Sequence, residues 1–113
     1  MIDWEKFNEI YLYNSGIACE IIDIWVADYD DRLTELTKNI AERDYKGLDD
    51  TAHSFKGTVV NFYDPETEKY SYLLEQMGKR KIPDEGMEET FDKLKIAADK
   101  LLIELKEYRK NHS

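Results

Sequence analysis

The chain has 113 residues, of which 42% are hydrophobic and 36% are charged, so it can bury a core and does not resemble a disordered segment. Its net charge of −9 repels nucleic acid, and no compact basic patch offsets that charge. No apolar run approaches the ~20 residues needed to cross a bilayer. We therefore expect a single domain over residues 1–113, with neither nucleic acid nor membrane among its partners.

The cysteine content and the first residues bear on the compartment. Cys19 is the only cysteine, so the chain cannot form an internal disulfide. The opening residues MIDWEKFNEI are acidic and amphipathic, unlike a secretory signal. We therefore expect a reduced, cytoplasmic setting.

The first two predicted helices span residues 3–13 and 17–43. In the first, the apolar face consists of Trp4, Phe7, Ile10 and Tyr11. In the second, apolar residues recur every three or four positions, as expected for one buried helix face: Ala18, Ile22, Trp25, Tyr29, Leu33, Leu36 and Ile40. The acidic run at Asp28, Asp30 and Asp31 predicts a kink or a break. We interpret these acids as a solvated face, because they lack the glycine and the spaced glutamate of a calcium loop.

The next two predicted helices flank a short turn. A helix over 46–62 has a buried stripe of Tyr45, Leu48, Ala52, Phe55, Val59 and Phe62. The following helix starts at Asp64-Pro65-Glu66, where aspartate is a good N-cap and proline suits the first helical position. It ends near 78–81, where glycine and cations are typical stop signals. It carries Glu66, Tyr70, Leu73, Leu74 and Met77, with Tyr70, Leu73 and Met77 as its predicted apolar stripe.

The last predicted helix spans 84–110 and starts at Pro83 and Asp84. Its stripe has alternating spacings of four and three: Met87, Phe91, Leu94, Ala98, Leu101, Leu105 and Tyr108. The polar tail that contains His112 is expected to be disordered. Short connections force neighbouring helices to run antiparallel. The predicted fold is therefore all-α, an antiparallel up-down four-helix bundle with an additional short N-terminal helix.

One stretch in the third long segment, TAHSFKGTVVNF at 51–62, has a pattern that suggests chemistry. His53 lies beside the buried stripe on a partly exposed face, with Lys56 at i+3 and Gly57 at i+4. A glycine inside a helix costs about 1 kcal/mol relative to alanine, but it clears space beside the imidazole. A neutral imidazole has a free lone pair, so this arrangement suits attack on a bulky anion such as a phosphoryl group. Spacing alone leaves open that His53 is an ordinary surface histidine.

The segment AHSFKG at 52–57 resembles the histidine-phosphotransfer (HPt) domain family, whose motif is close to A-H-x-L-K-G. The resemblance extends over most of the chain. It includes an acidic turn at 42–44 before the motif helix and a Leu-Glu pair downstream, matched to Leu74 and Glu75. The expected helical layout agrees with it independently.

The resemblance implies that His53 accepts a phosphoryl group and passes it between receiver-domain aspartates in a two-component phosphorelay. It implies that Lys56 helps to neutralise the phosphoryl charge and that Gly57 gives access. Glu75, with Gln76 as the second candidate, would hydrogen-bond the other ring nitrogen.

The partners implied are response-regulator receiver domains and a hybrid sensor histidine kinase. On this reading the chain is a phosphocarrier and not an enzyme. It needs no cofactor, and Mg²⁺ is expected only in the partner receiver domain. The absence of a phosphate-binding glycine loop from the sequence agrees, because it gives no sign of ATP binding.

The sequence departs from the family pattern at two positions. Phe55 stands where leucine is usual, which is a tolerable exchange in a core. Tyr63 stands where the family often has glycine, ten residues after the histidine, so the shape of that connection is in doubt. Tyr63 and Phe62 are expected either to close the bundle end or to line a docking surface, to which Val60 and either Ile17 or Ile21 would contribute.

Two other interpretations stay open at this point. The chain is alternatively a helical binding module that docks a receiver or another signalling partner and never carries phosphate. It is also conceivable as a fragment of a larger sensor kinase.

Overall fold

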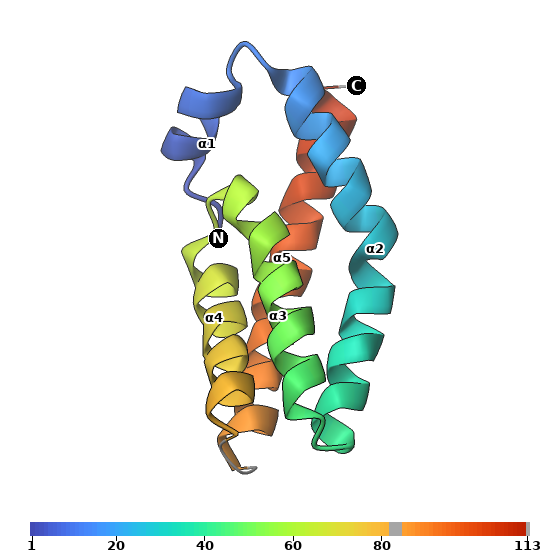
Figure 1. The fold of residues 1–113 in the computed structure, drawn as a ribbon. Coiled ribbons are helices and arrows are strands. Elements are labelled where there is room, and N and C mark those ends of the chain that lie inside the picture. Colours follow the sequence, from blue (N-terminus) through green and yellow to red (C-terminus); the bar gives the residue numbers. More distant parts are fainter. Residues whose placement is uncertain (82–84, 113) are drawn as a thin grey trace.

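The computed structural model describes residues 1–81 and 85–112, and the regular secondary structure within these ranges is entirely helical. Figure 1 shows the elements in chain order: α1 (Trp4–Tyr11), α2 (Ser15–Ala41), α3 (Tyr45–Val59), the single 3₁₀ turn η1 (Val60–Phe62), α4 (Pro65–Arg80) and α5 (Glu85–Asn111). The all-α prediction is confirmed. The predicted helix start at Pro83 and Asp84 lies outside the described residues.

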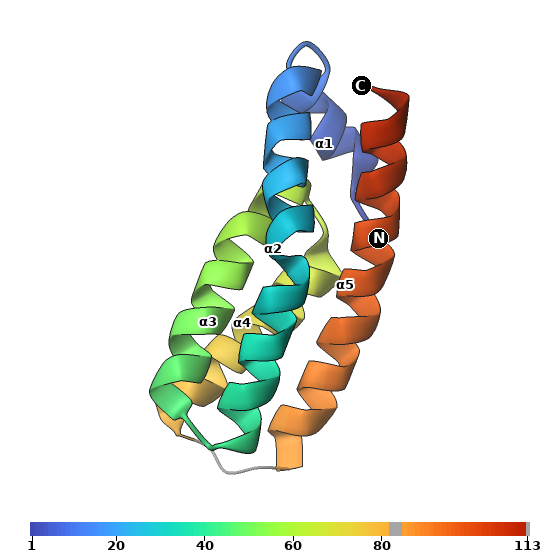
Figure 2. The same cartoon turned by 90° about the vertical axis from the view of Figure 1, so that its right-hand side faces the viewer.

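The four longer helices lie side by side, and each contacts two of the others. Helix α3 lies between α2 and α4, and α5 completes the contacts by touching both α4 and α2. Helix α1 lies at the end of the molecule where α2 begins and α5 ends (Figure 2). No helix in the described ranges has an apolar stretch long enough to span a bilayer.

The predicted apolar stripes of α2, α3 and α5 form the core. Phe55, Ile22, Leu36, Leu94 and Leu101 are among its fully buried side chains. The predicted N-cap of α4 is also confirmed, because the buried Asp64 carboxylate accepts hydrogen bonds from the backbone N–H groups of Glu66 and Thr67. Burial of one side of each helix fixes which residues face solvent.

Helix α2 is continuous, so the predicted kink or break at the acidic run is wrong. Trp25 and Tyr29 keep the helix packed on the core through this region, while Asp28, Asp30 and Asp31 are exposed on its outer side. Solvated carboxylates on the outer face place no constraint on the backbone, which explains why the charge run does not interrupt the helix.

The buried face of α4 differs from the predicted one. It consists of small and polar residues around one leucine, namely Thr67, Ser71, Leu74, Glu75 and Gly78, whereas Tyr70, Leu73 and Met77 are only half-buried. A Cβ added at Gly78 would lie 2.6 Å from the Asp49 nitrogen and 2.7 Å from the Tyr45 oxygen. The small side chains therefore let α3 and α4 approach closely, and they bring Glu75 into the seam between them.

Tyr63 closes one end of the molecule. Its backbone is left-handed, with φ 57° and ψ 43°, a conformation that favours glycine. This is the position at which the resemblance leads one to expect glycine. The Tyr63 carbonyl accepts a hydrogen bond from the Asp3 N–H at 2.7 Å, and its side chain packs against the core. Of the two expected roles, closing the bundle end is the one that these contacts favour.

The C-terminal residues up to His112 are also part of the packed structure. The His112 ring stacks on Tyr108 with a centroid distance of 3.9 Å, and His112 Nδ1 lies 2.8 Å from the Tyr108 carbonyl oxygen. The expectation of a disordered tail is therefore wrong for His112. Ile10, predicted on the buried face of the first helix, is instead exposed.

Candidate functional site

Helix α3 orients His53 outward because its buried stripe faces the opposite way. Leu48, Ala52, Phe55 and Val59 are buried against the other helices. His53 lies to the side of this stripe, and its side chain is 69% exposed. The predicted exposure of the ring is therefore observed.

A single buried carboxylate contacts the side chains of both His53 and Lys56. Glu75, on α4, is only 2% exposed. Its Oε2 lies 2.7 Å from His53 Nδ1, and its Oε1 accepts a hydrogen bond from Lys56 Nζ at 2.9 Å. Between the two candidates that the sequence left open, Glu75 and Gln76, the contact to the ring is made by Glu75.

The charges and hydrogen bonds of His53 and Lys56 determine the ionisation state of the Glu75 carboxylate. Burial raises the pKa of Glu75, but the hydrogen bonds from Lys56 and His53, together with their charges, outweigh burial and hold the pKa of Glu75 below its ordinary value. Glu75 is therefore ionised at neutral pH and accepts both hydrogen bonds. A carboxylate accepting from Nδ1 places the ring proton on that nitrogen, which leaves the lone pair of the neutral ring on Nε2.

The surface beside the exposed His53 ring is open on the Gly57 side. Among residues 1–81 and 85–112, hydrogen bonds to His53 side-chain atoms involve Nδ1 alone. One helical turn further along α3, a Cβ added at Gly57 would meet no atom within 4 Å. Because residues four apart are neighbours on a helix surface, this gap adjoins the imidazole. Position 57 therefore places no side chain in the way of a group with tetrahedral oxygens that approaches the ring from this side.

Lys56 is more constrained than the sequence indicated. Its side chain is 22% exposed, and besides bonding Glu75 its Nζ lies 5.2 Å from the centre of the Tyr72 ring. Tyr72 precedes Glu75 by three residues on α4, so the two side chains lie on neighbouring parts of that helix. The sequence analysis did not identify Tyr72, although its i−3 position relative to Glu75 was a usable signal.

Apolar side chains are exposed on α2 and on η1, the turn that continues α3. Val60 on η1 and Ile17 on α2 are exposed as predicted, whereas Ile21 is half-buried against the core. Ile24, which the sequence analysis did not single out, is 58% exposed. It lines the boundary between α2 and α3 together with Ser54 and Thr58, so it lies next to the outward face of α3.

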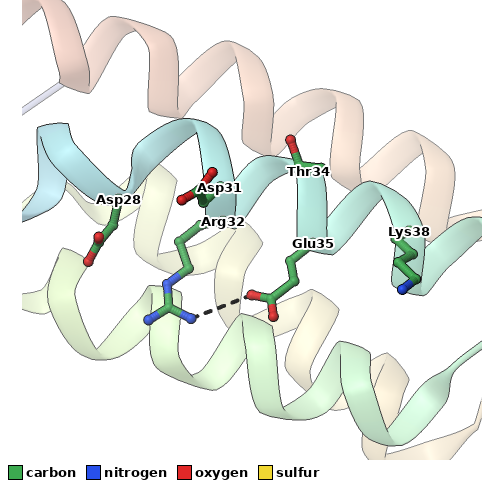
Figure 3. Close-up of a pocket in the computed structure, with 6 residues that line it drawn as sticks. All are labelled: Asp28, Asp31, Arg32, Thr34, Glu35 and Lys38. Atoms are coloured by element: carbon green, nitrogen blue, oxygen red, sulfur yellow. Dashed lines mark ion pairs between the residues drawn. The ribbon is translucent and has the colours of Figure 1, made fainter.

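Asp28 and Asp31 of the acidic run line an open hollow of about 430 Å³ along α2 (Figure 3). Asp28 and Arg32 extend toward α3, and Arg32 forms an ion pair with Glu35 at 3.6 Å. Within the described ranges, no group of three or more histidine, cysteine, aspartate or glutamate side chains is arranged to hold a metal ion. These acids are a solvated, negatively charged face, in agreement with the interpretation from sequence.

Comparisons with protein-family models, with curated proteins and with solved structures gave no match for this chain. The functional argument therefore depends on the site itself.

Proposed function

We propose that this protein is a histidine-phosphotransfer carrier of a cytoplasmic phosphorelay, with His53 as the phosphoacceptor. One observation carries the proposal. The exposed His53 ring is held at Nδ1 by the buried carboxylate of Glu75, and one helical turn further along α3 a Cβ at Gly57 would meet no atom within 4 Å. A histidine that only contacts solvent needs neither a buried charged partner nor a neighbouring position without a side chain.

The proposed reaction is a transfer between two carriers. The Nε2 lone pair of His53 attacks the phosphorus of a receiver-domain aspartyl phosphate. The N–P bond forms as the bond from phosphorus to the aspartate oxygen breaks, and the aspartate leaves as a carboxylate. Mg²⁺ in the receiver stabilises the charge on the phosphoryl oxygens. Positive charge develops on the imidazole as the N–P bond forms, and the Glu75 carboxylate at Nδ1 stabilises it.

Lys56 has two roles in this proposal. Its ammonium group balances the charge of the buried Glu75 in the resting protein, because both lie in a largely buried contact. It also lies on the same side of α3 as His53, one helical turn away, so its positive charge favours the arrival of a phosphoryl group. The residue is a positioning group for Glu75 first and a phosphate-stabilising group second.

The family fold belongs to the same proposal. We regard α2, α3, α4 and α5 as an antiparallel up-down four-helix bundle. The short connections between consecutive helices and the contacts of each with two others support that arrangement. In such a bundle α3 and α4 are rigidly packed neighbours, which keeps His53 and Glu75 in register.

The partner is a receiver domain, and the docking surface is the apolar area beside His53. Exposed Ile17, Ile24 and Val60 supply apolar contacts, and Asp28 beside them supplies negative charge. A receiver that presents an apolar helix with basic residues at its rim fits this surface by shape and by charge. The sensor kinase would reach the carrier through its own receiver domain.

The primary experiment is transfer of labelled phosphate. Receiver domains from the same cell, phosphorylated on aspartate, are incubated with the full chain, and the modified residue is mapped. We expect one acid-labile, base-stable label at His53. His53→Gln should abolish it without loss of helicity, whereas His112→Gln should retain it. Label at another residue, or binding without any label, would instead favour the binding-module alternative.

A series of side chains at position 57 tests the access argument. Gly57→Ala should retain most of the transfer rate, and Gly57→Leu should lower it by at least about tenfold, since a steric obstacle of about 1.4 kcal/mol at the transition state has that effect. Circular dichroism checks the fold of each variant. Equal transfer rates for the two variants would contradict the role given to the open space.

A matched pair of isoleucines tests the docking surface. Ile24→Lys should weaken receiver binding by about tenfold, the effect of losing one contact worth about 1.4 kcal/mol. Ile103→Lys is the control, because Ile103 is similarly exposed, at 69%, but lies on α5. If both substitutions weaken binding equally, the docking surface has been assigned to the wrong side.

A further inference from the structure

The indole of Trp25 is buried in the core of the α2–α3 interface. Its exposed fraction is 4%. The ring stacks on Tyr29 with centroids 5.6 Å apart, and it contacts Phe55 at 4.8 Å and Phe62 at 5.7 Å. Three aromatic neighbours fix the orientation of the ring, so its Nε1–H cannot turn outward to reach bulk solvent.

This N–H is unusual within the molecule. In the part of the chain that the structure describes, Trp25 Nε1 is the one buried side-chain nitrogen or oxygen without a hydrogen-bond partner. Leaving such a donor unsatisfied costs about 1–3 kcal/mol, and buried donors in native proteins are almost always satisfied by protein or by ordered water. The neighbouring Tyr29 hydroxyl donates to Asp99 and does not accept from the Trp25 N–H.

The same indole lines a small space between the two helices. The space has a volume of about 20 Å³ and is bordered on the α3 side by Ser54 and Thr58 and on the α2 side by Asp28. A site for one water needs about 10–15 Å³ and two to four polar partners. The volume is thus sufficient for a single water and too small for an organic ligand.

The polar groups around this space complement the indole. Ser54 and Thr58 each offer a hydroxyl, and Asp28 offers a carboxylate. None of these three side-chain groups hydrogen-bonds another residue in the ranges 1–81 and 85–112. An indole N–H is a donor only, so a molecule that satisfies it must accept a hydrogen bond from Trp25, and water can also donate to a hydroxyl or carboxylate oxygen.

We infer that the α2–α3 interface contains a structural hydration site, in which one water accepts a hydrogen bond from Trp25 Nε1 and donates to the hydroxyl of Ser54 or Thr58. The site joins α2 to the helix of His53 one residue away from that histidine. It lies on the α2 side of α3, whereas Glu75 holds the ring from the α4 side. The inference does not depend on the proposed phosphotransfer function.

Water-to-protein cross-relaxation in NMR spectra of the full chain tests the site. The chain has two tryptophans, so Trp25→Phe assigns the two indole resonances. We expect the Trp25 N–H to show a direct cross-peak to a bound water. Removing both hydroxyls with Ser54→Ala and Thr58→Val should reduce that peak by at least half. An ordered water needs two to four polar partners, and this double variant removes two of them.

The control variant is Thr37→Val, because Thr37 is an exposed α2 hydroxyl that bonds the Leu33 carbonyl and does not line the space. It should leave the cross-peak unchanged. Circular dichroism confirms that each variant is folded. A crystal structure should show one water within hydrogen-bonding distance of Trp25 Nε1. The inference is overturned if native protein gives neither the cross-peak nor the water, or if the double variant retains the full peak.

Discussion

Gly57 and Gly78 are both helical glycines near the candidate site, and their surroundings are opposite. A Cβ at Gly57 would meet nothing within 4 Å, whereas a Cβ at Gly78 would lie 2.6 Å from a backbone nitrogen of α3. Gly78 is required for packing, because α3 and α4 meet at that point. Gly57 has no packing requirement, so the space that it leaves is available to an incoming group. The same residue type thus serves the fold at one position and access at the other.

The largest expected effect is at Gly78. Gly78→Leu should lower the free energy of unfolding by about 3 kcal/mol or more, because the side chain has no space to enter and the α3–α4 seam must open. Gly57→Leu should instead raise that free energy slightly, by up to about 1 kcal/mol, because leucine is a better helix former than glycine and the position is open. Urea unfolding of both variants measures the difference. Similar values for the two would show that the seam is more adaptable than these contacts indicate.

The second effect concerns Glu75, which links the seam to the site. Glu75→Gln should lower the free energy of unfolding by about 1.5–3 kcal/mol at neutral pH, since it weakens two hydrogen bonds to a charged group. The pKa of Glu75 is lowered in the folded protein, so the stability that the carboxylate contributes is complete above the unfolded value near 4.5 and is lost as pH falls through the folded value.

The difference between native protein and Glu75→Gln should therefore be constant around neutral pH and shrink as the pH falls well below 4.5. Urea unfolding at about pH 7 and about pH 3 measures it. A matched control is Glu104→Gln, on α5, which is remote from the site. A difference that grows on acidification would mean that the sign of the Glu75 shift is wrong.

The smallest effect is the removal of the helix-weakening glycine itself. Gly57→Ala should raise the free energy of unfolding by about 0.4–1 kcal/mol, because alanine reduces the conformational freedom of the unfolded chain and meets no obstacle in the folded one. Gly78→Ala is the matched substitution and should change stability in the opposite direction, since its Cβ alone clashes with backbone atoms. Thermal unfolding of the two variants distinguishes these signs. A loss of stability in Gly57→Ala would remove the contrast.

Periodicity predicted the helices well where the buried face is apolar. The stripes of α3 and α5 follow a three-four repeat of large hydrophobic residues, and those residues are buried. In α4 the same reasoning selected Tyr70, Leu73 and Met77 and missed Thr67, Ser71 and Gly78. A close helix–helix approach selects small residues and not large apolar ones, so hydrophobicity identified Leu74 as buried but missed the small residues around it.

The residues of the candidate site likewise fall into those that helical periodicity predicts and one that it does not. The relative positions of His53, Lys56 and Gly57 follow from helical geometry alone, because all three lie within two turns of one helix. Helical geometry also predicts that these residues lie to the side of the buried stripe, and hence that His53 is exposed. Glu75 was identified as the partner of His53 through the resemblance to the HPt family. Helical periodicity alone gave this assignment little support, because an acid on a buried face contradicts the usual pattern.

Only tertiary packing decided how Glu75 is used. Its carboxylate reaches both His53 and Lys56 because the small residues of α4 let the two helices approach. The surroundings of the Trp25 N–H, which has no hydrogen-bond partner among the described residues, likewise depend on aromatic rings from separate elements. Local sequence determines helices and their outward faces, since those depend on neighbours a few residues apart. The partners across a helix interface depend on how closely the backbones pack, which no single segment determines.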